Sequence, residues 1–589
     1  MLSRAIAWVA TAAGLLLIVV LVTGGFRFEV GPIRVSAHGV APPLLMMAIA
    51  GAALRWLGAG RARDALASLI GDVARHAPAI AVVSATAIAA VGVGFGTFAA
   101  SSADPSAYVS HSTLIDDGRL TIDEPLARAV GWHEATWTVT PLGYRPGRTP
   151  GTIVPGYPLG LPIVMAGAHR LFGDIGPFLV GPALAALAVL ALYTLAARWS
   201  NPGAGAIAAV LVASSPIVQF QTVQPMSDVP AMAWWTLAAA LASRRTLAAS
   251  AGAGLVTGLA VLTRPNLAPL GAVVAAVALG WPRPISSTSF DWRRLASYVA
   301  GGAPAALLLV AFQQRLYGSP LQTGYGDLSE FFAVANIWPN IAGYARRVLT
   351  GEAPALALTA AALVTLAVAR RGALSAGTGA LMKLAAASSA VLLALYLPFG
   401  VFPDWSSFRF LMPALPLVFA ALGGLVSEAL DRLPPAARGP ALLASLTLLV
   451  SLNVTHAAQQ SSYALRDYEA RYRTVGLYLA ASMPANTVLV TSQESGSAHY
   501  YTGLPVLRWD LLAIDLETAI ERLRVLGRHP VLVVEDWEKP LLRQRFPSGP
   551  IASLDWPPRA DAGRTTRVGV WDPAERSAPP SSIVTDRLP

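Results

Sequence analysis

The chain has 589 residues, of which 54% are hydrophobic and 13% are charged, and its mean hydropathy is +0.54. Soluble domains carry about 25% charged residues, so this composition excludes an ordinary soluble protein and indicates an integral membrane protein. The net charge of +10 is carried by arginines that fall in small clusters between apolar runs, which argues against a nucleic-acid-binding protein, and the absence of cysteine excludes thiolate metal sites.

Apolar segments long enough to cross a bilayer, which takes about 20 helical residues, recur up to residue 456. They predict an all-α polytopic membrane domain over residues 1–456 with about thirteen transmembrane helices. Glycine-rich stretches inside these spans, such as residues 251–260, predict close contacts between helices. The expected spans are 5–23, 40–57, 78–98, 175–197, 203–220, 229–243, 247–263, 266–281, 296–313, 353–369, 382–400, 410–428 and 440–456.

The arginines predict the orientation, because short loops rich in arginine stay in the cytoplasm. With the N-terminus inside, every such loop falls on the cytoplasmic side. These loops carry Arg61, Arg63, Arg75, Arg198, Arg244, Arg245, Arg283, Arg293, Arg294, Arg370, Arg371, Arg432 and Arg438. The loops 99–174, 314–352 and 401–409, and the chain after residue 456, are then expected on the external side.

The chain after the last span has a different pattern. Residues 457–589 contain an amphipathic helical stretch, three short β-type runs ("TVLVTS", "PVLRWD" and "VLVVEDW") and a helical stretch, "DLETAIERLRVLG". Alternating strands and helices predict a small external α/β domain. The last residues, rich in proline, serine and arginine, are expected to be a loose end.

Ionisable residues are nearly absent from the middles of the predicted spans, which weakens an ion-coupled transporter. Charges instead collect where helices meet the external water, at Asp104, Asp228, Arg264, Arg315, Asp327, Asp404 and Arg409. This position suits a substrate that is half lipid and half water-soluble, such as a polyprenyl phosphate sugar. Its phosphate needs arginine, and the acceptor hydroxyl needs a carboxylate that takes a proton.

Several stretches at these positions resemble the membrane-embedded glycosyltransferases of the GT-C fold, of the protein O-mannosyltransferase and lipid A aminoarabinose transferase type. "SADPSAYVSHSTLIDDGRL" is similar to the first external loop of that family, and "TIVPGYPLGLPIVMA" to its return into the membrane. "QPMSDVPAMAWW" resembles the entry into a later span, and "LTRPN", "YGSPLQTGY" and "FRFLMPALP" recur in such enzymes. The resemblance covers most of the chain and also implies an external C-terminal domain.

The resemblance implies that Asp104 is the catalytic general base on the acceptor. Many relatives have Asp-Glu here, whereas this chain has Asp104-Pro105; where relatives carry a basic residue in the returning stretch, this chain has Tyr157. A phosphate contact from this loop then has to come from Arg145 or Arg148, or from elsewhere. The residues expected to bind substrate are Tyr108, Arg145, Tyr157, Asp228, Arg264, Tyr325 and Arg409.

Each of these residues also has a structural interpretation. Asp104 and Asp228 could cap helices, and Arg264 could belong to a polar turn. Arg409 could be an interfacial arginine that snorkels to the membrane surface, and Tyr325 could belong to an aromatic belt. The other acids of the first loop, Asp116, Asp117, Asp123 and Glu124, suit turns. His111, His133 and His169 lack metal-ligand spacing, so no residue is assigned to a metal, and a divalent-metal cofactor is left open.

The sequence therefore favours a glycosyltransferase in the inner or plasma membrane of a bacterium. It would move a sugar from a polyprenyl-phosphate donor to a glycan, lipid or protein acceptor of the cell envelope. Two other interpretations remain open: a transporter or flippase of a lipid-linked solute, and a non-catalytic scaffold that binds such lipids.

Overall fold

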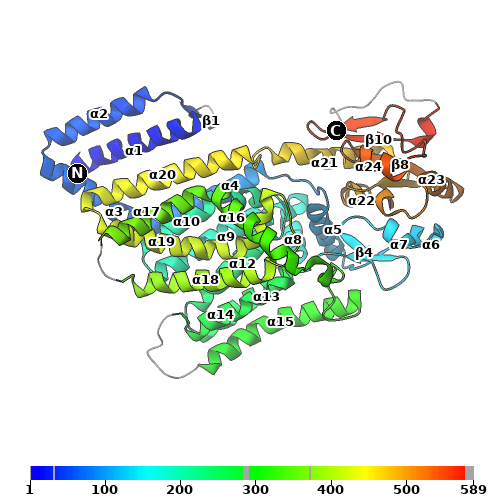
Figure 1. The fold of residues 1–589 in the computed structure, drawn as a ribbon, viewed down its shortest axis with the longest axis horizontal. Helices are drawn as coiled ribbons and strands as arrows, with labels where there is room; N and C mark the ends of the chain where they lie inside the picture. Colours follow the sequence, from blue (N-terminus) through cyan, green and yellow to red (C-terminus); the bar gives the residue numbers. More distant parts are fainter. Residues whose placement is uncertain (1, 31–32, 283–290, 370–372, 578–589) are drawn as a thin grey trace.

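The computed structural model describes residues 2–30, 33–282, 291–369 and 373–577. Helices form an elongated bundle, and a mixed α/β unit lies at one end of it (Figure 1). Arg283, Arg370 and Arg371, which contribute to the predicted orientation, and the end of the expected loose tail lie outside the described residues.

The bundle is built from alanine- and leucine-rich helices, several of which begin at a capping side chain such as Asn201, Thr246 or Ser375. A two-stranded hairpin, β1 (Phe26–Val30) and β2 (Ile33–Ala37), joins the first two helices. The helices are α1 (Leu2–Thr23), α2 (Ala41–Trp56), α3 (Ala59–Arg75), α4 (Ala77–Phe95), α9 (Gly176–Trp199), α10 (Pro202–Ser214), α11 (Pro216–Thr222), α12 (Asp228–Ala242), α13 (Leu247–Thr263), α14 (Leu270–Leu279), α15 (Trp292–Tyr317), α16 (Ile337–Gly351), α17 (Ala353–Ala369), α18 (Ala376–Tyr396), α19 (Leu415–Arg432) and α20 (Pro435–Gln459).

Among the described residues, seven helices are long and apolar enough to cross a membrane, and up to nine if each of two bent helix pairs is one span. The remaining expected spans fall on shorter apolar helices such as α2, α13 and α14. The expectation of a polytopic helical protein is confirmed, and the count of thirteen stays a prediction.

The centre of the bundle is formed by α9, α10, α12 and α19, whose side chains Leu192, Ile207, Met232 and Phe419 are buried. The predicted glycine contacts are present between α13 and α15. A Cβ atom at Gly254 would collide with the carbonyl oxygen of Tyr298 on α15. Small residues therefore allow two backbones to meet, as residues 251–260 predict.

The 99–174 segment folds at the same end of the bundle as the α/β unit (Figure 1). It forms a three-stranded antiparallel sheet in the order β3-β5-β4, with short helices around it. Its elements are α5 (Asp104–Asp116), β3 (Ile122–Asp123), α6 (Leu126–Ala129), α7 (Ala135–Thr138), β4 (Tyr144–Pro146), β5 (Thr152–Pro155), α8 (Gly160–Phe172) and η1 (Gly173–Ile175).

After α20 the chain forms the C-terminal α/β unit, defined as residues 465–575. Its five-stranded sheet has the order β7-β6-β8-β10-β9, in which β6 runs parallel to β7 and β8, and β10 antiparallel to β8 and β9. Its elements are α21 (Leu465–Ser482), β6 (Thr487–Thr491), α22 (Ser495–Thr502), β7 (Val506–Arg508), η6 (Trp509–Leu511), α23 (Leu516–Val525), β8 (His529–Glu535), α24 (Lys539–Arg545), β9 (Ala560–Ala562), β10 (Val568–Trp571) and η7 (Pro573–Glu575).

The C-terminal α/β unit and the 99–174 segment share a hydrophobic core. Leu126 and Val130 from the segment are buried in one cluster with Val488, Leu532 and other side chains of the sheet. The two regions are far apart in sequence, so this core fixes one against the other at the end of the bundle.

Candidate active site

Asp104 is the first residue of α5, with Pro105 next to it in the first turn, where proline is favoured. No side-chain cap is present at this end of the helix. The carboxylate instead accepts a hydrogen bond from the Tyr157 hydroxyl and lies 3.6 Å from Arg409 Nη2. The capping interpretation of Asp104 therefore fails, and the side chain is available for other chemistry.

Asp228 is the first residue of α12 and also makes no cap. Its carboxylate is fully buried, 3.0 Å from Arg264 Nη2 and 4.0 Å from Arg409 Nη1. Arg409, on the 3-10 helix η5 (Trp405–Ala414), therefore lies between the two acids. We name Asp104, Tyr157, Asp228, Arg264 and Arg409 together the Asp104 site.

Arg264 is held at the end of α13 by several contacts. Its Nε donates to Ser227 Oγ at 3.2 Å, and the same oxygen accepts from the Tyr108 hydroxyl at 2.9 Å. Its other terminal nitrogen, Nη1, is buried and has no hydrogen-bond partner among the described residues. A buried guanidinium donor without a partner costs free energy unless a ligand satisfies it.

Gly160 explains how the returning stretch reaches this position. A Cβ atom at Gly160 would collide with the backbone nitrogen of Thr263, so α8 begins in direct contact with the end of α13. That contact brings Tyr157, just before α8, close to Arg264, just after α13. Larger side chains at residue 160 would separate the two stretches.

Aromatic rings surround the carboxylate of Asp104. The ring of Tyr157 lies 5.0 Å from that of Tyr108 and 5.6 Å from that of Tyr325. Burial, with the negative charge of Asp104 adding to it, raises the pKa of Tyr108 and of Tyr157 above the usual tyrosine range. Both hydroxyls are therefore protonated donors at neutral pH.

The predicted binding residues divide into two groups. Tyr108, Tyr157, Asp228, Arg264 and Arg409 converge on Asp104 as described, and Tyr325 packs on Tyr157. Arg145, by contrast, donates to the carbonyl of Thr323 at 2.9 Å and lies over the ring of Tyr317. These side-chain contacts are with the last residue of α15 and with the loop that follows this helix.

The acids expected to be turn residues have partners outside the Asp104 site. Asp116 pairs with His169 at 2.8 Å and with Arg170 at 2.5 Å, and Asp123 with Arg128 at 3.0 Å. Buried Glu124 accepts from the backbone nitrogen of Leu126. These contacts give Asp116, Asp123 and Glu124 structural roles.

The carboxylates of the Asp104 site do not suit a divalent cation, because each faces a guanidinium group that would repel it. Among the described residues, no group of three histidine or acidic side chains is placed to hold a metal ion.

Three site residues were not singled out from the sequence. Ser227 joins Tyr108 to Arg264, and Asn266 donates to the Tyr396 hydroxyl at 2.7 Å. Ser227 stands next to Asp228 in the sequence, and Asn266 stands two residues after Arg264. Their proximity to these predicted charges was the available signal. Tyr396 had no such signal, since it ends an apolar helix.

The fold is that of the GT-C membrane glycosyltransferases, and the chain is a multi-pass membrane protein. The structure of ArnT from Cupriavidus metallidurans in the apo state matches with a TM-score of 0.51 and 12% identity, covering 82% of this chain and 96% of ArnT. The same ArnT bound to undecaprenyl phosphate matches with a TM-score of 0.48 and 12% identity, covering 78% of this chain and 94% of that one.

The oligosaccharyltransferase AglB from Archaeoglobus fulgidus, in complex with an inhibitory peptide and a dolichol-phosphate, matches with a TM-score of 0.47 and 13% identity. That match covers 86% of this chain and 75% of AglB. No family model and no curated protein matches the sequence. The similarity is therefore one of fold.

Proposed function

We propose that this protein is a membrane glycosyltransferase that moves a sugar from a polyprenyl-phosphate donor to an acceptor. The observation that carries the proposal is the Asp104 site, where the accessible carboxylate of Asp104 lies 3.6 Å from Arg409, and Asp228 lies between Arg409 and Arg264. Arg264 Nη1 is buried and has no hydrogen-bond partner among the described residues. A phosphate is the ligand that satisfies such donors. The shared fold is compatible with this class of reaction.

The arginines bind the phosphate of the donor in this proposal. Arg409 is 25% exposed at its side chain, and Arg264 presents Nη1 from a buried position held by Ser227 and Asp228. Negative charge grows on the phosphate oxygen as the bond to the sugar breaks. Preorganised guanidinium donors stabilise that charge in the transition state.

Asp104 acts as the general base. Its side chain is 31% exposed, so an acceptor hydroxyl or amine can reach it. As the acceptor atom forms its bond to the anomeric carbon, its proton passes to Asp104, and the polyprenyl phosphate leaves with the electrons of the broken C–O bond. Attack opposite the leaving group inverts the configuration. The Tyr157 hydroxyl and Arg409 orient the carboxylate.

The acceptor is proposed to be a glycan, lipid or protein of the cell envelope, and the protein to lie in a bacterial inner or plasma membrane with its C-terminal α/β unit outside. The 99–174 segment and this unit then share the external side. Because the chain has no cysteine, Asp117→Cys and Val525→Cys, both at exposed positions, can each be labelled with an impermeant thiol reagent on intact cells. Labelling of only one would contradict the orientation.

The direct test of the function is Asp104→Asn. Asparagine keeps the size of the side chain but takes no proton at neutral pH, so transfer from a polyprenyl-phosphate sugar should fall by about a hundred- to ten-thousandfold. Asp123→Asn is the matched control, because Asp123 pairs only locally with Arg128 in the observed contacts. Turnover near the wild-type level in the Asp104 variant would contradict the role of Asp104 as the base, whereas no transfer by the wild-type protein would support a flippase or a lipid-binding scaffold instead.

A further inference from the structure

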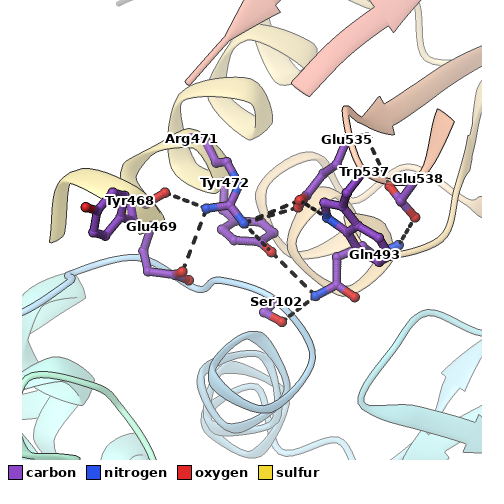
Figure 2. Close-up of polar contacts among 9 residues, drawn as sticks. All are labelled: Ser102, Tyr468, Glu469, Arg471, Tyr472, Gln493, Glu535, Trp537 and Glu538. Atoms are coloured by element: carbon purple, nitrogen blue, oxygen red, sulfur yellow. Dashed lines mark hydrogen bonds and ion pairs between the residues drawn. The ribbon is translucent and has the colours of Figure 1, made fainter. Parts of the chain in front are cut away.

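A hydrogen bond joins the C-terminal α/β unit to the turn that leads into Asp104. Gln493 follows β6, and its Nε2 donates to Ser102 Oγ at 2.6 Å (Figure 2). Ser102 lies two residues before Asp104. The 391 residues that separate Gln493 from Ser102 show that this is a tertiary contact between regions and not a local turn.

The backbone at Gln493 is held in place by a buried carboxylate, that of Glu538. The backbone nitrogen of Gln493 donates to Glu538 Oε1 at 3.0 Å, and the backbone nitrogen of Glu535 donates to the other oxygen of Glu538, also at 3.0 Å (Figure 2). Glu538 and Glu535 are both buried. A buried carboxylate that bridges the ends of two neighbouring strands restricts the movement of the Gln493 side chain.

Ser102 needs such support because its backbone has φ +50°, a left-handed conformation that is rare outside glycine and asparagine. Such residues persist where the surrounding structure holds them. The carbonyl of Ser102 accepts from the Ser106 hydroxyl, one turn into α5. The conformation of Ser102 therefore sets the direction in which α5, and Asp104 at its start, leaves the turn.

A second contact from the same turn leads indirectly to the stretch before Tyr157, the hydrogen-bond partner of Asp104. Ser495 Oγ accepts from the backbone nitrogen of Leu142 at 3.1 Å, and the next carbonyl, that of Gly143, accepts from Gly156 at 2.8 Å. Gly156 immediately precedes Tyr157. The C-terminal α/β unit thus contacts the stretch that carries Asp104 directly, and the stretch that carries Tyr157 through Leu142 and Gly143.

The approach between the regions is close. A Cβ atom at Gly496 would lie 2.6 Å from Ser106 Oγ and 2.7 Å from the carbonyl oxygen of Leu142. The turn from residue 493 to residue 496 therefore lies directly against the first turn of α5 and against the chain before β4. Only glycine at residue 496 leaves room for both.

We propose that this turn is a positioning element for the Asp104–Tyr157 pair, with Gln493 as the positioning residue that acts through Ser102. The proposal rests on the proposed role of Asp104 as the base. It makes the C-terminal α/β unit part of the catalytic apparatus, because a base held loosely at its acceptor loses rate steeply with small displacements.

The test compares Gln493→Ala with Asn486→Ala in the full-length protein. Asn486 is the matched control, since it carries the same kind of side chain at the other end of β6 and donates to Gly527, away from α5. The first readout is amide hydrogen exchange of residues 101–107, which needs no substrate. Exchange in Gln493→Ala should be about tenfold faster than in the control.

The second readout is catalytic. With a donor sugar that the wild-type chain accepts, Gln493→Ala should lower kcat by about tenfold and leave the affinity for polyprenyl phosphate unchanged, because Arg264 and Arg409 are held by other elements. Ser102→Gly removes the hydroxyl without the backbone strain. If Gln493 acts through Ser102, the double variant should lose no more than Ser102→Gly alone.

Exchange and kcat equal to those of Asn486→Ala, or losses that multiply in the double variant, would overturn the positioning role. Failure of the proposed function would be distinguished from failure of the positioning role by a different experiment. Retained transfer in Asp104→Asn would show that Asp104 is not the base. Amide exchange of residues 101–107 alone would then decide whether the turn from residue 493 to residue 496 holds them in place.

Discussion

Two clusters of acids lie close together in this protein, and they balance their charge in different ways. In the Asp104 site, two aspartates face two arginines, Arg264 and Arg409. In the C-terminal α/β unit, an acid cluster surrounds Arg471, which lies 3.3 Å from Glu535 and 3.8 Å from Glu469. That cluster consists of Glu469, Glu494, Glu535 and Glu538.

The two clusters differ in the protons and cations that balance their negative charge. Burial raises the pKa of Glu538 to about 7 and that of Glu494 well above its usual range, and Glu535 beside Glu494 adds to the second shift. The acid cluster therefore balances its charge with bound protons as well as with Arg471. The Asp104 site instead contains two arginines that can bind a phosphate, which is what the proposed transfer from a lipid-linked sugar requires.

Among the changes that compare the two clusters, the largest effect is expected from removing Arg264. Loss of a charge-assisted hydrogen bond costs about 1.5–3 kcal/mol, so Arg264→Met should weaken polyprenyl phosphate binding by about ten- to a hundredfold. It also leaves Asp228 buried beside only the more distant Arg409, which destabilises the fold. The double variant Arg264→Met/Asp228→Asn should recover folded protein but not phosphate binding.

The matching change in the acid cluster is Arg471→Met, which should destabilise the C-terminal α/β unit and leave phosphate affinity unchanged. Binding of polyprenyl phosphate to purified protein measures one effect, and the apparent melting temperature measures the other. If both arginine variants lost phosphate affinity equally, the distinction between the two clusters would not hold.

A smaller effect concerns pH. The raised pKa values mean that the folded unit binds more protons than the unfolded chain between the usual glutamate pKa and the raised values. Stability should therefore fall as pH rises from about 4.5 through 7. Glu494→Gln supplies a permanent donor to Glu535, so it should flatten this decline and melt about 3–6 °C higher than wild type at pH 8.

Thermal unfolding followed by tryptophan fluorescence from pH 5 to pH 8 measures this effect. Glu521→Gln, at an exposed position on α23, is the control and should leave the pH dependence unchanged. A Glu494 variant with the wild-type decline would show that Glu494 does not hold a proton in the folded state.

Much of the Asp104 site could be predicted from the sequence, because charged residues next to apolar runs stand out. Asp104, Asp228, Arg264 and Arg409 were visible in this way, and so were the glycines between α13 and α15. The strands β6, β7 and β8 also lie where short apolar runs predict them. In each case the signal is local.

The parts that were not predicted depend on tertiary contacts. Tyr396 ends an apolar helix, and nothing near it in the chain indicates that Asn266 reaches its hydroxyl. The strand β10 was not predicted, because its short apolar run lies near the end of the chain among residues rich in proline and arginine. The bond from Gln493 to Ser102 joins distant regions, so no window of the sequence contains it.

The most direct measurement is a structure of the full-length protein with polyprenyl phosphate bound. Phosphate density should lie within hydrogen-bonding reach of Arg264 Nη1 and Arg409, with the carboxylate of Asp104 facing the open side of the site. A phosphate bound elsewhere on the bundle, with Arg264 Nη1 still unpartnered, would contradict the proposed function.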